Sequence, residues 1–234
     1  MKNHMITTAF AVTLSAGVAA AQEFKGDITL GYSAFTQDTS VNRLAAEGAF
    51  EFGVSDRGSV QLDLGLYGFG ASNFDGTNLV LHGIYDVNAQ GSAGLFLGLE
   101  EVDGDSIDFY GLEYGQSFGT GGVEAYVARG EDAGVTGTLI GVEGEFAVSD
   151  SFGLGLKLDN ADFNGALDVT RLGVKGIYAL GQGSSVYAEI GSLRADAFGL
   201  SGSEGFVGVG LSIGLGGDEA TFGRRGLLNL IPGL

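Results

Sequence analysis

Apolar and polar residues alternate strictly along one segment of this chain after another. In SVQLDLGLYGFG, residues 59–70, an aliphatic side chain occupies every second position, and glutamine, aspartate, glycine and tyrosine lie between them. Because successive side chains of a strand point to opposite faces, this period predicts a β-strand with one wholly apolar face. The other face carries glycine and carboxylate, which make a poor hydrophobic core. This segment alone does not decide which face is the interior.

The same period predicts about twelve strands, and no segment has the period of a helix. An all-β fold is therefore expected. The strands are expected near residues 26–35, 44–55, 59–70, 78–87, 93–101, 107–118, 123–129, 138–149, 152–159, 169–180, 186–193 and 205–215.

The connections alternate between tight turns and longer polar loops. SDRGS at 55–59 and GTGG at 119–122 are rich in turn residues, whereas TQDTSVN at 36–42 and GEDAGVTG at 130–137 are longer and polar. Strands that follow the tight turns begin 29 to 34 residues apart. This spacing indicates a repeat of β-hairpins, with short turns on one side of the sheet and long loops on the other.

From Phe24 to Leu215, this pattern resembles the outer-membrane β-barrels of Gram-negative bacteria, and more loosely the porin-like proteins among them. The resemblance implies an antiparallel up-and-down transmembrane β-barrel of about 12 strands, with both termini in the periplasm. The aliphatic residues of 59–70 would face lipid, and the residues between them would face a lumen. It also implies outer-membrane lipid, lipopolysaccharide and the barrel-assembly machinery as partners.

Aromatic residues support this arrangement, because they gather near the tight-turn ends of the predicted strands on the lipid face. Outer-membrane barrels carry such girdles at the membrane interfaces. The girdle residues are Phe52, Tyr85, Tyr114, Phe146, Phe152 and Tyr178.

Both ends of the chain differ from the repeat. Residues 1–21 have the charge, the short apolar run and the small residues before Gln22 that are typical of a signal peptide. The barrel is expected over 22–216, followed by a tail over 217–234. In this tail, Arg224 and Arg225 precede an apolar run, which fits an interfacial segment, a plug folded into the pore, or a frayed end. The resemblance implies an aromatic last residue that the assembly machinery recognises, and this chain ends differently.

Charge and cysteine content exclude further classes. The chain has a formal net charge of −18, and removing residues 1–21 with Lys2 would make it −19. Such a field repels nucleic acid, so no nucleic-acid partner is expected. The chain has no cysteine, which excludes a disulfide framework.

The polar face of the strands supplies the candidate site. Here carboxylates outnumber bases, and Lys157, Arg171 and Lys175 lie on two neighbouring strands. A basic strip opposite an acidic wall makes a transverse field, which can select ions in a water-filled pore. The candidate pore-lining residues are Glu47, Glu51, Asp63, His82, Asp86, Glu113, Glu124, Glu143, Glu145, Lys157, Arg171, Lys175 and Glu189.

Two functions fit this lumen. The expected one is a small passive channel for ions or small polar solutes, with a weak cation preference. The alternative is a non-conducting structural or adhesive barrel, in which pairs such as Glu143 or Glu145 with Lys157 fill the lumen. The sequence does not indicate an oligomeric state.

Catalysis, metals and cofactors are not expected. His82 is the only histidine beyond the signal peptide, and it is predicted to face the lumen beside Asp86 as a satisfied side chain. No hydrolase, zinc-protease or nucleotide-binding motif occurs. The acidic stretch 100–108 lacks the spacing of a calcium loop and is expected to be solvated. The remaining alternatives are a lumen-bearing enzyme and a soluble secreted β-protein.

Overall fold

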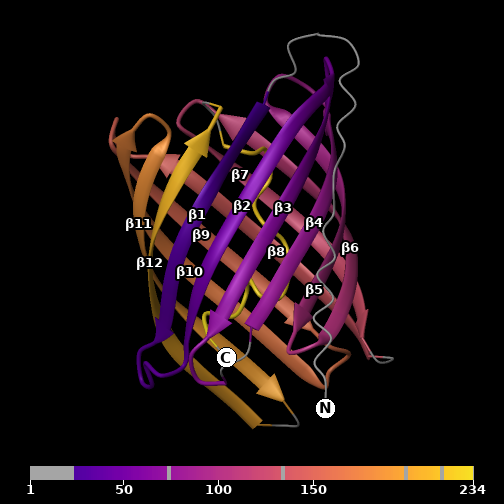
Figure 1. Cartoon of the computed structure of the whole chain (residues 1–234), viewed down its shortest axis with the longest axis vertical. Helices are drawn as coiled ribbons and strands as arrows, with labels where there is room; N and C mark the ends of the chain where they lie inside the picture. Colours follow the sequence, from indigo (N-terminus) through magenta and orange to yellow (C-terminus); the bar gives the residue numbers. More distant parts are fainter. Residues whose placement is uncertain (1–23, 73–74, 133–134, 198–199, 217–218, 234) are drawn as a thin grey trace, which may run out of the picture.

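Twelve antiparallel strands close into a barrel in the computed structural model (Figure 1). The structure describes residues 24–72, 75–132, 135–197, 200–216 and 219–233, so the expected signal peptide lies outside the described residues. The strands are β1 (Phe24–Phe35), β2 (Asn42–Ser55), β3 (Gly58–Phe69), β4 (Asp75–Asp86), β5 (Gly91–Val102), β6 (Asp105–Phe118), β7 (Gly121–Asp132), β8 (Val135–Ala147), β9 (Phe152–Asp162), β10 (Leu167–Gly181), β11 (Ser184–Ala197) and β12 (Leu200–Leu215).

Each strand pairs with its neighbours in sequence, and β1 also pairs with β12. In this closing pair, Gly26 lies opposite Leu215 and Phe35 lies opposite Phe206. Closure leaves no sheet edge with unpaired backbone groups, which is the condition for a sheet in hydrocarbon. The predicted all-β fold and its twelve strands are therefore confirmed. Among the described residues, no helix is long and apolar enough to cross a membrane.

Several connections predicted as long loops are strand instead. β5 and β6 are joined only by Asp103 and Gly104, whose φ angles of 51° and 91° fit a two-residue hairpin turn. β7 continues to Asp132 and β8 begins at Val135, within the predicted loop 130–137. The prediction was wrong because polar strand ends have the composition of loops. The connection at 36–41 is a genuine loop.

The apolar face points outward, as predicted. Leu66 and Leu156 are 63% and 52% exposed, whereas Asp63 is fully buried inside the barrel. The predicted girdle residues lie on the same outer face, and Tyr85 and Tyr178 are more than half exposed there. The interior is therefore lined by the polar and glycine-rich positions of the strands.

Residues 219–233, here called the C-terminal segment, lie inside the barrel. The segment enters at the tight-turn end, where the Thr221 N–H donates to Glu51 of β2. It reaches the opposite end, the loop end, where the Ser33 hydroxyl donates to the Pro232 carbonyl. Figure 1 shows it in yellow, descending through the barrel from the end where β12 stops. Of the three placements considered for the tail, the structure shows the plug.

Candidate functional site in the barrel lumen

All of the candidate pore-lining residues lie on the inner side of the barrel. Glu51, Asp63, His82 and Glu113 are buried around the C-terminal segment. The others line a polar cavity beside the segment: Glu47, Asp86, Glu124, Glu143, Glu145, Lys157, Arg171, Lys175 and Glu189.

Wall carboxylates accept hydrogen bonds from backbone N–H groups of the C-terminal segment. Glu100 of β5 accepts from Leu227 at 2.8 Å and from Leu228 at 3.0 Å. Glu124 of β7 accepts from Gly223 at 3.1 Å through each of its oxygens. These two acids therefore hold the backbone of the segment at two levels.

Wall donors take up the carbonyl groups of the same segment. Gln61 of β3 donates to the Phe222 carbonyl at 2.7 Å, while its own amide oxygen accepts from the Phe222 N–H at 3.1 Å. Asn78 of β4 donates to the Arg225 carbonyl at 2.9 Å. Nearer the loop end, the guanidinium groups of Arg43 and Arg171 donate to the carbonyls of Leu228 and Asn229. Side chains of the wall thus satisfy backbone N–H and carbonyl groups of the segment that a neighbouring strand would otherwise bind.

The side chain of Arg225 is fully buried among acids from three strands. Its guanidinium lies 2.9 Å from Glu113, 3.1 Å from Glu124 and 3.6 Å from Glu143. It also lies over the ring of Tyr126, 4.3 Å from the centroid. An arginine keeps its charge in a protein, so this cluster pairs the cation with several carboxylates away from water.

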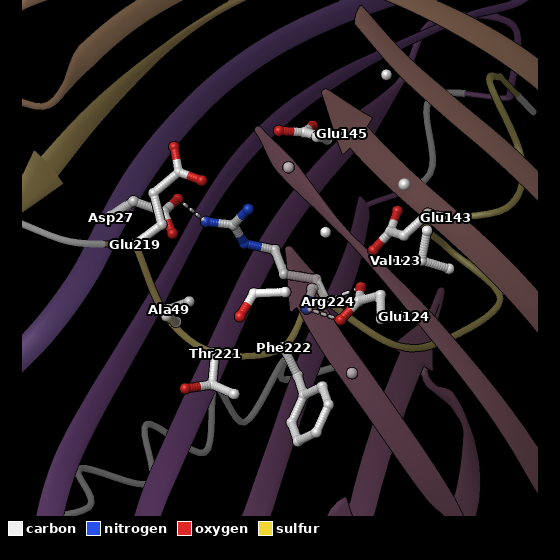
Figure 2. A pocket seen from close by; sticks show the side chains of 18 of the residues that line it. Asp27, Ala49, Val123, Glu124, Glu143, Glu145, Glu219, Thr221, Phe222 and Arg224 are labelled. Atoms are coloured by element: carbon white, nitrogen blue, oxygen red, sulfur yellow. Dashed lines mark hydrogen bonds and ion pairs between the residues drawn. The ribbon is translucent and has the colours of Figure 1, made fainter. Parts of the chain in front are cut away.

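Arg224 points the opposite way, across the lumen. Figure 2 shows its side chain reaching toward Asp27 and away from Glu124 and Glu143. The structure records an ion pair between Arg224 and Asp27 of β1. Neighbouring arginines of the C-terminal segment therefore connect opposite sides of the barrel.

His82 has different partners from those expected. Its Nδ1 lies 2.6 Å from Glu113 and its Nε2 lies 3.0 Å from Asp63, so both ring nitrogens are engaged. Asp86, predicted to be its neighbour, instead accepts a hydrogen bond from Ser92. The prediction placed Asp86 by distance along one strand, whereas strand pairing and the curvature of the sheet bring Asp63 of β3 and Glu113 of β6 to the histidine.

A polar cavity of about 1000 Å³ lies between the C-terminal segment and the wall. Its lining includes Asp56, Arg57 and Gln90 from the tight-turn end, but no described residue of the loop-end connections. Nine acidic and seven basic side chains line it. Some of these form ion pairs: Lys157 with Glu143 at 3.2 Å, Arg171 with Glu189 at 2.6 Å and Lys175 with Glu145 at 3.2 Å.

The sequence and the structure were compared with known proteins. No family model matches the sequence, and neither does any curated protein. Solved structures do match. A KdgM porin in complex with disordered oligogalacturonate has a TM-score of 0.63 at 13% identity, over 80% of this chain and 98% of that one. The NanC porin has a TM-score of 0.60 at 9% identity, over 81% of this chain and 100% of that one.

A third match is an outer-membrane channel from Pseudomonas putida F1, with a TM-score of 0.57 at 11% identity, over 85% of this chain and 97% of that one. The chain has the fold of an outer-membrane porin. At these sequence identities the similarity concerns the fold alone. The roles of individual residues in this porin-like barrel are therefore inferred from the contacts in its own lumen.

The loop-end half of this porin-like barrel contains an apolar cluster in its interior, which was not predicted. Leu230 of the C-terminal segment packs there with inward side chains of the wall, including Phe96, Phe109 and Leu139. An apolar cavity of about 340 Å³ adjoins Leu227. The inward parity of Phe109 and Leu139 was available from the sequence. The leucines that pack against them belong to the C-terminal segment, whose position the sequence did not predict.

Proposed function

We propose that this chain is an outer-membrane channel for ions and small polar solutes, restricted by its C-terminal segment. The observation that carries the proposal is the polar cavity of about 1000 Å³, which runs beside the segment within a closed barrel. The porin fold supports the same function and the same location. We extend the proposal to outer-membrane lipid and lipopolysaccharide as surroundings, and to the barrel-assembly machinery as the partner during insertion.

The lining of the cavity supports a weak cation preference. Its nine acids exceed its seven bases by a small margin, and ion pairs such as Lys157 with Glu143 use one of each and leave that excess unchanged. A small excess of carboxylates attracts cations without excluding anions. The candidate pore-lining residues that face the cavity would set this preference. They are Glu47, Asp86, Glu124, Glu143, Glu145, Lys157, Arg171, Lys175 and Glu189.

Planar-bilayer recording tests the channel. The full chain is compared with a variant that carries a protease site between Gly216 and Glu219, folded intact and then cleaved. We expect small conductance steps from the full chain and larger steps once the cleaved segment has left. Fractionation and heat-modifiable migration in detergent gels would show membrane location and barrel folding independently.

The non-conducting barrel is the second candidate, and the C-terminal segment is the observation that favours it. The segment spans the lumen from Glu51 to Ser33, and the polar cavity has no described loop-end residue in its lining. Folded protein that gives no current before or after cleavage would establish this candidate and remove the channel.

A further inference from the structure

The lumen wall recognises the C-terminal segment largely through its backbone. Glu51, Gln61, Glu124 and Glu100 receive its N–H groups. Side chains of the wall also donate to its carbonyls, from the level of Phe222 to that of Pro232. The donors are Gln61, Asn78, Arg43, Arg171 and Ser33. Backbone groups are common to all peptides, so such contacts require a peptide rather than one particular sequence.

Two glycines mark where the wall touches the backbone most closely. A Cβ at Gly226 would collide with Glu100 and Asn78, and one at Gly223 would collide with Glu143 and Glu124. The wall side chains therefore reach the main chain itself at these points. The two residues between these glycines are Arg224 and Arg225, so residues 223–226 read Gly-Arg-Arg-Gly.

The same wall selects for basic side chains. Arg225 inserts among Glu113, Glu124 and Glu143, and Arg224 pairs with Asp27. A guanidinium offers several donors in a planar fork, which suits a pocket bounded by carboxylates. The net charge of −18 would also draw cationic peptides toward the barrel.

We propose that the lumen is a binding track for non-helical peptides with paired basic side chains, and that the C-terminal segment is its built-in occupant. This inference rests on the proposed channel and names a substrate class for it. The polar cavity beside the segment opens at the tight-turn end, so an exchanging peptide has room to enter beside the one that leaves.

Exchange of the cleaved segment tests this inference in the complete, folded protein. The chain has no cysteine, so Leu234→Cys gives a single site for a fluorophore. After cleavage between Gly216 and Glu219, release of the labelled segment is followed by fluorescence anisotropy. The competitors are a synthetic peptide of residues 219–233, a peptide of equal length that keeps only the central Gly-Arg-Arg-Gly and is otherwise unrelated, and the 219–233 peptide with R224Q and R225Q.

We expect the unrelated Arg-Arg peptide to displace the segment at concentrations within about tenfold of the 219–233 peptide. The glutamine version should be at least about 30-fold weaker, because it leaves buried carboxylates unpaired. The inference is overturned if only the 219–233 peptide competes, since the lumen would then hold a dedicated plug. It is also overturned if the cleaved segment never exchanges, or if both arginines prove dispensable.

A matched pair of wall variants completes the test. Glu100 accepts two N–H groups of the segment, whereas its neighbour Glu101 is exposed on the outer face. We expect E100Q to speed release about tenfold and E101Q to leave it unchanged. Because anisotropy needs no current, competition without conductance would remove only the channel, and conductance without competition would remove only the peptide track.

Discussion

Gly226 lets the C-terminal segment lie directly against the wall of the barrel. Its φ of 127° disfavours any L side chain, and a Cβ would meet both Glu100 and Asn78. We expect Gly226→Ala to push residues 226–228 off the wall and raise single-channel conductance in planar bilayers. Gly83 lies in open space on the outer face of β4, so Gly83→Ala should leave the conductance unchanged. An unchanged G226A conductance would mean that this contact does not limit the passage.

Arg225 is the second residue on which the plug depends. Arg225→Gln would leave Glu113, Glu124 and Glu143 without their shared cation. Breaking a buried pair in this way costs about 3–5 kcal/mol, which favours release of the segment. In a Leu228→Cys background the buried thiol reports release, and its maleimide labelling should become at least about 100-fold faster.

Arg194 supplies the control for this substitution. It is exposed on β11 and forms an ion pair with Asp196 on the same strand, away from the C-terminal segment, so Arg194→Gln should not change the labelling rate. Equal labelling rates in R225Q and R194Q would show that the buried arginine does not hold the segment.

At the scale of single strands, the outer face should tolerate charge according to depth. Leu156 lies mid-strand in β9 and is half exposed, whereas Leu44 lies near the loop end of β2 on the same outer face and is 62% exposed. In a membrane barrel, we expect Leu156→Arg to cost about 2–4 kcal/mol and Leu44→Arg about 0–1 kcal/mol. Urea unfolding in lipid vesicles measures both. Equal costs would contradict the membrane depth assigned to these strands.

For the whole molecule, the charge of the cavity predicts a selectivity that depends on salt. Reversal potentials in a KCl gradient should show a modest preference for K⁺ over Cl⁻ near 0.1 M, where the screening length is about 10 Å. The preference should fade near 1 M, where that length is about 3 Å. A preference for Cl⁻ would contradict the proposed role of the acidic lining, since the bases would then control the passage.

The sequence by itself determined the twelve strands, their hairpin order and which side chains face inward. These follow from a period of two residues, which is a local property of the chain. Leu66 outside and Asp63 inside were readable for that reason. The ends of the strands were harder to predict from the sequence, because a polar strand end such as that of β7 has the composition of a loop.

Only the tertiary structure decided what fills the lumen. The tail was compatible with three placements, because nothing within 217–234 says where its partners lie. Arg225 meets Glu113 across 112 residues of sequence, and His82 meets Glu113 across 31. Such contacts exist only once the strands have paired in register and the sheet has curved into a barrel around the segment. The physical reason is that a strand fixes which way its side chains point, while the pairing and curvature of the whole sheet fix what they meet.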